Sequence, residues 1–435
     1  PGANPTGCRG VANGDALNVP GRIELRDYPQ VTRRRDGVNA TLDWTPSALN
    51  EIAFRAMWNR FSDDEVRYRT RYALADGTFN PVLGAGVGTV TGATALRDVR
   101  LRYVEQQMTS LSLSGRHARP SGLQLDWVAN YARAIEDRPD VITMSFRQTG
   151  MNYAYNLTRP ETPLVTGADS ATTVRFDDPT RFAYRDVSRE LRATRDRDFG
   201  GRANLSIPFG AGFTLKTGVA YRTKARTNRI DVPTFRGFRS GTSAPASSLA
   251  ALSTPGDTAD AFFGGQFQFG RRANPGLVRE FVLSNAGILA PRVPETLLAS
   301  ATGDFDVNED VAAAYAMATW DVGRLRLIPG VRVERASIDN RANDVRRVAV
   351  GGVDTVTVTP TTGSRTWTNV FPGITARYNV DARTVLRGAV TTAIFRPNFR
   401  DFVPYRIAQA GEPIGELGNP ALEPTTSTNF DVSIE

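Results

Sequence analysis

Cysteine, histidine and lysine are nearly absent from this chain of 435 residues. It has one cysteine, Cys8, and one histidine, His117, and only Lys216 and Lys224 are lysines among its 53 basic residues. A single cysteine excludes a disulfide framework within the chain, and one cysteine with one histidine cannot form a Cys/His zinc cluster. The same scarcity removes most imidazole and thiolate chemistry from consideration.

Long hydrophobic runs are also missing. No segment approaches about eighteen consecutive apolar residues, so the sequence predicts no transmembrane helix, and nothing at the beginning resembles a signal peptide. A search for hydrophobic runs does not detect a membrane β-barrel, because its alternating strands never reach a high average hydropathy. The chain begins at Pro1 rather than Met and stops at Glu435 within an apparent strand, so we expect a fragment.

The net charge of +8 is carried almost entirely by arginine. Arginine residues are interleaved with Asp and Glu nearly everywhere, and no compact basic tract with interleaved aromatic residues stands out. Dispersed charge of this kind does not predict a nucleic-acid surface.

The stretch from Glu309 to Glu334 reads as two long strands joined by a short turn at 321–323, where the residue types suit a hairpin. The second run alternates apolar residues with other residues, which is the period of a strand with two unlike faces. Its faces carry Leu325, Leu327, Val331 and Val333 on one side, and Arg326, Gly330, Arg332 and Glu334 on the other. Each run spans roughly ten to fourteen residues, longer than the usual strand of about five or six.

The same hairpin pattern recurs along the chain. The expected strand pairs are 38–45 with 49–61, 99–116 with 123–134, 197–207 with 213–226, and 366–378 with 383–395, and a further strand begins at Thr428. The connections between hairpins are long, at 64–98, 135–196, 227–308, 337–365 and 396–427. Short turns at one end and long loops at the other are typical of outer-membrane barrels. The sequence therefore predicts an all-β fold, a large antiparallel transmembrane β-barrel, here a partial barrel of at least 11 strands.

The two faces of the expected strands fit this interpretation. Leu, Val, Phe, Ala and Thr on one face, with Tyr and Trp near strand ends, are typical of a lipid-facing band edged by aromatic residues. The other face is polar, which requires a wide barrel, because small barrels fill their interiors with side chains. We expect Arg326, Arg332 and Glu334 to line the lumen, where they would face a plug or a solute.

Three segments resemble the conserved C-terminal half of TonB-dependent receptors: 369–373 (NVFPG), 395–402 (FRPNFRDF) and 418–431 (GNPALEPTTSTNFD). The last is similar to the family signature GNP-x-L-x-P-E-T-S-x-N-Y-D, with Thr425 where the family usually has Glu. Residues 327–334 (LIPGVRVE) resemble the family pattern P-G-x-R-x-E just upstream. Residues 59–67 resemble a subgroup found in Xanthomonas and Caulobacter relatives.

The resemblance implies a barrel of about twenty-two strands around an N-terminal plug, located in the outer membrane of a Gram-negative bacterium. It also implies energised uptake of a scarce, large nutrient, such as a glycan or ferric siderophore, driven by a TonB–ExbB–ExbD complex. We expect residues 1–435 to be a barrel domain truncated at both ends, with the plug before Pro1 and the last strands after Glu435. No enzymatic activity and no cofactor are implied.

Ligand capture is expected in the long loops. Aromatic rings with amide or guanidinium donors suit sugars or anionic siderophores. The candidates in the third long loop are Phe262, Phe263, Gln266, Phe267, Phe269 and Arg271, and those in the second are Tyr153 and Tyr155. The alternative is that these rings only pack a folded loop.

Other functions remain as alternatives or are disfavoured. A passive porin-like or adhesin-like barrel without energy coupling is the alternative. A secreted carbohydrate-active enzyme is disfavoured because no paired carboxylates are placed for glycoside chemistry, and we expect no catalytic residue. The segment 304–310 opens like a calcium loop, but Glu309 replaces the required glycine and Tyr315 the bidentate glutamate. We therefore predict no metal site.

Overall fold

The computed structural model describes residues 8–9, 19–82, 85–159, 162–210, 212–245, 247–257, 262, 267, 269–351, 353–409 and 416–435. Seventeen strands belong to one sheet, and β1 (Cys8–Arg9) pairs separately with β2 (Val19–Pro20). In the described part of the chain, no helix combines the length and hydropathy that a transmembrane helix requires.

Eleven strands form the wall of a partial barrel, each antiparallel to the next, as the sequence predicted. In chain order they are β3 (Ile23–Ser47), β4 (Asn50–Ala73), β6 (Val87–Ala118), β7 (Gln124–Asn156), β9 (Ala183–Pro208), β10 (Phe213–Asp231), β13 (Phe305–Val322), β14 (Leu325–Val350), β15 (Val353–Asn379), β16 (Val385–Phe395) and β19 (Thr425–Ile434). The all-β barrel class is thus confirmed.

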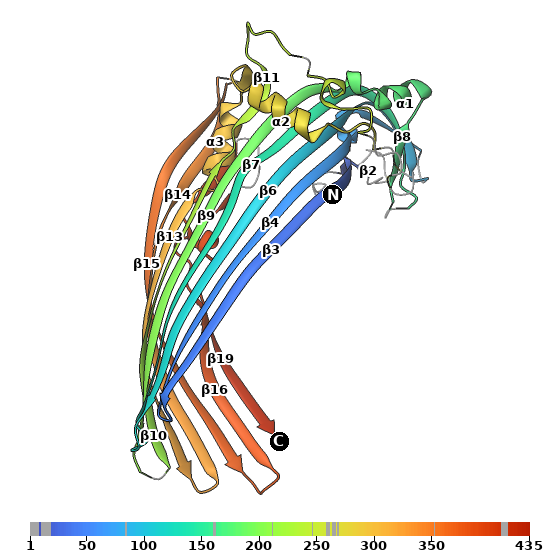
Figure 1. Ribbon diagram of the computed structural model, residues 1–435. Coiled ribbons are helices and arrows are strands. Elements are labelled where there is room, and N and C mark those ends of the chain that lie inside the picture. Colours follow the sequence, from blue (N-terminus) through green and yellow to red (C-terminus); the bar gives the residue numbers. More distant parts are fainter. Residues whose placement is uncertain are drawn as a thin grey trace.

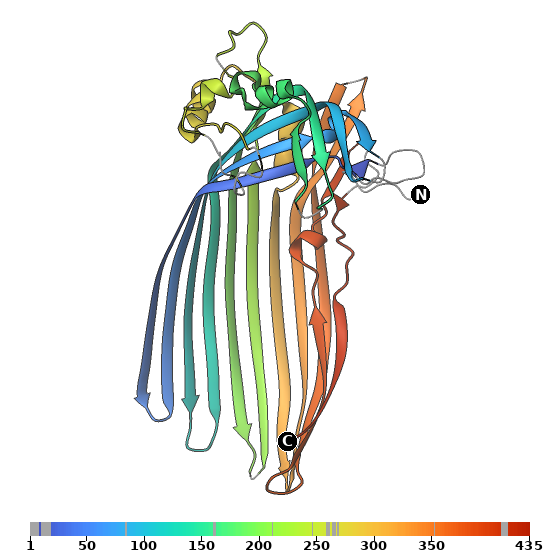
Figure 2. The same ribbon diagram turned by 90° about the vertical axis from the view of Figure 1, so that its right-hand side faces the viewer.

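The wall is strongly curved (Figures 1 and 2). Strand β3 pairs with β4 along one margin, and β19 pairs with β16 along the other. All ten residues of β19 are exposed. These two strands carry the backbone hydrogen-bonding groups at the margins of the partial barrel.

The hairpin turns gather at one end of the wall, drawn at the bottom of Figure 1. Gly122, Gly210 and Gly323 adopt positive φ angles of 83°, 73° and 58° in three of these turns, a conformation that glycine reaches without steric cost. The other end carries short strands and helices. These are η1 (Leu74–Asp76), β5 (Thr78–Val82), β8 (Leu164–Gly167), α1 (Ser170–Asp177), η2 (Pro179–Arg181), β11 (Thr234–Phe238), η3 (Ala250–Leu252), α2 (Pro275–Ser284), β12 (Leu289–Pro291), α3 (Val293–Ala301), α4 (Phe399–Phe402), β17 (Arg406–Gln409) and β18 (Glu416–Leu417).

The predicted bounds of the long loops are wrong, because the strands extend well beyond the ends predicted from the sequence. The segment 337–365 is no loop at all: β14 and β15 stay paired from Leu325–Tyr378 as far as Val350–Val353. The outer face of β14 changes from Val331 and Val333 to Arg335 and Ser337 along this course. Past Glu334 the outer face is polar, while the inner face carries the buried Ala336 and Ile338. The pattern of apolar outer and polar inner residues therefore ends there although the ladder hydrogen bonds continue, so this pattern detects only the lipid-facing part of each strand.

The outward face of the apolar part is exposed and hydrophobic. Its exposed residues include Val38, Leu42, Leu111, Leu113, Tyr131, Phe199, Val219, Tyr221, Val331, Val333, Val370, Ile374, Val390 and Phe430. Trp44, Trp320 and Tyr378 are exposed near the turn end, as aromatic residues at a membrane interface are. An exposed apolar band of this extent is what a lipid-facing wall requires.

Neighbouring residues on β10 offer a direct test of the two faces. Val219 is 61% exposed on the outer face, whereas Ala220 pairs with Arg202 and Ala313 on the inner face. In the intact protein we expect Val219→Arg to lower the free energy of unfolding by about 2–4 kcal/mol and Ala220→Arg by about 1 kcal/mol or less. Denaturant titration in lipid vesicles measures both. Equal losses would contradict the assignment of the faces.

Candidate functional site

Charged side chains form ion pairs across the inner face of the wall. Lys224 on β10 pairs with both Asp198 on β9 and Glu309 on β13, and Arg222 lies two residues along β10 on the same face. The Arg222 guanidinium lies 2.5 Å from an Asp198 carboxylate oxygen and 3.9 Å from a Glu309 oxygen. Lys224 lies 3.4 Å from Asp196 in the same row. The inner face is therefore a polar surface of paired charged side chains rather than a packed core.

The predicted lumen residues on β14 extend this polar wall. Arg332 Nε lies 2.8 Å from Glu334 Oε1, and Arg396 Nη2 lies 2.7 Å from Glu334 Oε2. Arg326 lies near the turn, with its Nε 2.6 Å from Asp321 Oδ1. Glu334 thus holds one arginine of the wall and one from the chain after β16.

The chain after β16 folds back along the inner wall. We call its described residues, 396–409 and 416–424, the inner segment (red in Figure 2). Phe402 and Val403 are almost fully buried against Val307, Ile338 and Trp367. The rings of Trp367 and Phe402 meet edge to face with centroids 5.3 Å apart. The inner segment therefore occupies part of the space enclosed by the wall.

Behind the inner segment lies a cavity of about 270 Å³. Its polar lining residues come from two strands and two loops: Arg192, Asn228, Thr302, Asp304 and Tyr405. Asn228 Oδ1 accepts from Thr194 at 2.7 Å, and its Nδ2 donates to the Gly303 carbonyl at 2.6 Å. Burial raises the pKa of the Asp304 carboxyl, although the Ile230 amide donates to it and opposes this shift. The cavity is thus lined by one basic side chain, Arg192, and one acidic side chain, Asp304.

The predicted loop residues converge on one buried cluster at the far end of the wall. Tyr153 and Tyr155 are 1% and 2% exposed, and Phe269 is 2% exposed. Phe262 and Phe267 pack against the same cluster and are partly buried. Phe263 and Gln266 lie outside the described residues. The rings that are described thus contact protein rather than solvent in this conformation.

Arg271 lies beside this cluster and is held by the loop itself. Its Nη1 donates to the Thr254 carbonyl at 2.6 Å. The neighbouring Arg272 forms an ion pair with Asp27 on β3 and lies over the Tyr68 ring at 5.2 Å. Arg272 therefore fastens the loop after β11 to the wall.

Arg97 on β6 is central to the cluster and was not predicted from the sequence. It is 4% exposed and lies over the rings of Phe176 and Phe182 at 4.6 and 4.2 Å. It donates to the Phe176 carbonyl at 2.5 Å and to the Arg271 carbonyl at 3.4 Å. Burial lowers its pKa to about 10. An arginine on an alternating strand gives no sequence signal of such burial.

No group of His, Cys, Asp and Glu side chains in the described ranges is arranged to hold a metal ion. The carboxylates of Asp196, Asp198 and Glu334 form ion pairs with arginine or lysine. The arrangement can bind polar solutes through paired charges.

An exposed apolar band, a charged inner face, and turns at one end opposite loops at the other define this chain as an outer-membrane β-barrel protein. Residues 136–435 match the model of the TonB dependent receptor-like β-barrel, and the chain belongs to this family. The family consists of outer-membrane transporters rather than enzymes. The segments that carried the resemblance in the sequence lie within the matched residues, except for 59–67.

Solved structures similar to this chain include three receptors that are named for a ferric complex or a siderophore. They are the ferric-catecholate import receptor Fiu of E. coli K12 in its closed form (10% identity, TM-score 0.42, 94% of this chain and 55% of that chain), the siderophore receptor PiuA of Acinetobacter baumannii (8%, 0.39, 94% and 54%) and the ferric yersiniabactin uptake receptor FyuA of Yersinia pestis (9%, 0.35, 96% and 52%). The chain spans about half the length of each. A search of the curated proteins found no match.

Proposed function

We propose that this chain is the barrel part of an outer-membrane receptor that imports a scarce, large nutrient, with energy delivered by a TonB–ExbB–ExbD complex. The observation that carries the proposal is the wide, ion-paired inner face in a chain of this family. A polar wall allows a hydrated solute to pass along the lumen, whereas a packed core would exclude it.

The charge of the lining favours an anionic cargo such as a ferric siderophore over a neutral glycan. Arg192 lines the inner cavity, and Arg332 and Arg396 share a single carboxylate partner, Glu334. Guanidinium groups bind carboxylates and similar anions through two parallel hydrogen bonds. A glycan is the second candidate cargo, because the rings of the aromatic cluster, buried in this conformation, would offer the faces that sugar rings use once the loop opens.

Uptake by the intact receptor tests the proposal. Cells that produce it take up a panel of radiolabelled ferric siderophores and fluorescent oligosaccharides, with and without an active TonB protein. We expect accumulation of one cargo to require TonB and to saturate at low concentration. Uptake that is indifferent to TonB would contradict energy coupling and favour a passive, porin-like barrel.

The aromatic loop residues are proposed to contribute to capture when the loop opens. We expect Phe267→Ala together with Phe269→Ala to raise the half-saturating cargo concentration about tenfold, equivalent to about 1.4 kcal/mol. Uptake at limiting cargo is the measurement, with the amount of barrel in the membrane determined in parallel. Phe209→Ala, a phenylalanine 56% exposed at the turn end, is the matched control. Unchanged uptake in the double variant would contradict the assignment of these residues.

A further inference from the structure

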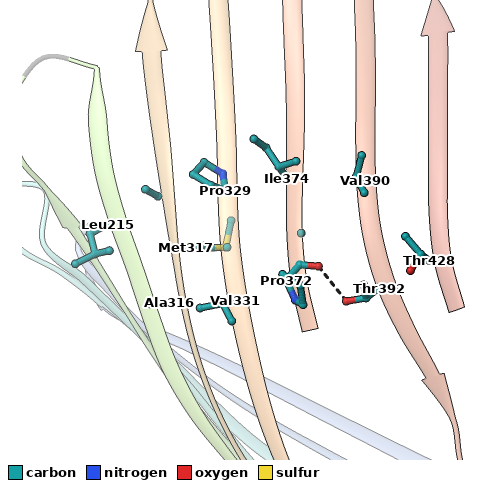
Figure 3. A pocket seen from close by; sticks show the side chains of 13 residues that line it. Leu215, Ala316, Met317, Pro329, Val331, Pro372, Ile374, Val390, Thr392 and Thr428 are labelled. Carbon is teal, nitrogen blue, oxygen red and sulfur yellow. Dashed lines mark hydrogen bonds between the residues drawn. The ribbon is translucent and has the colours of Figure 1, made fainter. Parts of the chain in front are cut away.

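The outer wall contains an apolar groove of about 680 Å³ across strands β10, β13, β14, β15, β16 and β19. Figure 3 shows it from close by, with Ala316 and Met317, Pro329 and Val331, and Pro372 and Ile374 coming from three neighbouring strands. Two glycines, Gly330 and Gly373, also line it. No charged residue lies among the lining residues.

The groove arises from two proline–glycine pairs placed side by side. Gly330 pairs with Gly373, and Pro372 pairs with Val331, so the two dipeptides face each other across β14 and β15. Proline has no N–H group to donate to a neighbouring strand. The ladder between β13 and β14 runs to Met317–Gly330 and resumes at Trp320–Leu327. Small side chains beside this interruption, Ala316 and Ala318, leave the wall hollow.

The groove lies on the lipid-facing side of the wall. Ala316 pairs with Val331, which is 44% exposed, and Pro329 pairs with Ile374, also 44% exposed. Val390, 38% exposed, borders the groove on β16. These residues continue the exposed apolar band described above. In the membrane, the groove is therefore continuous with the surface that acyl chains already cover.

The groove offers few hydrogen-bonding groups to a water molecule. The lining hydroxyl of Thr392 donates to the Pro372 carbonyl at 2.9 Å, so this hydrogen-bonding capacity is used within the wall. The groove is open to the surrounding hydrocarbon, and an acyl chain that did not follow its contour would leave lining atoms without contacts. Dispersion contacts are individually small but add up over a chain that fills such a hollow.

We propose that this groove seats one acyl chain of an outer-membrane phospholipid. The groove lies about five to eight residues from the turns that end β13, β14 and β15, so the acyl chain, and not the headgroup, reaches it. The proposal rests on the membrane location of the barrel and not on its cargo or its energy coupling. An acyl chain gains no hydrophobic free energy when it moves from the surrounding lipid into the groove. Its preference for the groove over the rest of the wall therefore comes from shape complementarity alone.

A photoreactive phospholipid tests the site. The intact receptor is placed in vesicles of phosphatidylethanolamine with a small fraction carrying a diazirine in the middle of one acyl chain, and peptide mass spectrometry locates the adducts. We expect adducts to concentrate on peptides with Ala316 to Ala318 and Val331. Ala316→Phe fills the groove and should reduce these adducts at least about fivefold.

Ala314→Phe is the matched control, because Ala314 lies on the same face of β13 but outside the groove. It should leave the groove adducts unchanged. If Ala316→Phe fails to fold, as judged by heat-modifiable migration, Ala318→Leu replaces it with the same expected loss. Adducts spread evenly over the apolar band, or the same loss in Ala314→Phe, would overturn the proposal, as would cross-linking of this face to a second protein. Cargo uptake is measured separately, because it tests the proposed transport function. A loss of uptake neither supports nor contradicts lipid binding in the groove.

Discussion

Replacing Arg97 by alanine is expected to detach the loop cluster from the end of the wall. The substitution leaves the Phe176 and Arg271 carbonyls without this donor and opens a cavity between the rings of Phe176 and Phe182. Orphaned buried acceptors cost about 1–3 kcal/mol each, and cavities add to that cost. We expect the local free energy of opening to fall by about 3 kcal/mol, so that hydrogen exchange at 172–182 and 269–273 accelerates by roughly a hundredfold.

Two further variants separate the causes of this effect. Arg97→Met keeps much of the volume but donates no hydrogen bond, so we expect about half of the loss. Arg181→Ala removes an exposed ion pair with Asp178, in which Arg181 is 56% exposed, and should cost about 0.5 kcal/mol or less. Hydrogen-exchange mass spectrometry of the intact receptor compares the three. Similar exchange in Arg97→Ala and Arg181→Ala would show that Arg97 does not fasten the loops.

Replacing Phe402 by alanine is expected to free the inner segment from the wall. Phe402 is 1% exposed and packs edge to face on Trp367. Truncation of a buried phenylalanine costs about 3–5 kcal/mol, which is large for a segment of this length. We expect amide protection of residues 399–405 to fall on the order of a thousandfold, or to the level of an undocked chain.

A neighbouring phenylalanine provides the control for this measurement. Phe395 ends β16, four residues before α4, and is 65% exposed. Phe395→Ala should change protection of the inner segment by less than about 1 kcal/mol. Glu334→Gln, which weakens the contact with Arg396, should give an intermediate effect. An equal response to Phe395→Ala and Phe402→Ala would contradict the docked arrangement.

The barrel wall could be predicted because its physical signals are local. Alternation between lipid and lumen marks residues such as Val219 and Lys216, and turn residues such as Gly323 mark the hairpin ends. Eleven strands in the expected order followed from these two signals. The extensions beyond the apolar band were missed because the outer face of β14 becomes polar from Arg335 while the inner face carries Ala336 and Ile338. The pattern of apolar outer and polar inner residues that marks a lipid-facing strand is lost there.

The candidate site was predicted less well, because its contacts join residues far apart in the chain. Arg97 meets Phe176 and Arg271 across 79 and 174 residues. The inner segment was expected to be a surface loop, yet Phe402 and Val403 are buried. Proline and polar residues around 397–398 suggest a loop without indicating which side of the wall it follows.

The extended hairpin of β14 and β15 has a consequence for how the protein can diversify. From Glu334 to Val350 the two strands remain paired without a break, and Arg347 pairs with Asp354 close to the tip. Backbone hydrogen bonds fix the shape of this projection, so its outward side chains can be exchanged without displacing it. Mutation can therefore alter the side chains that the hairpin presents at the loop end of the wall while the backbone that carries them keeps its shape.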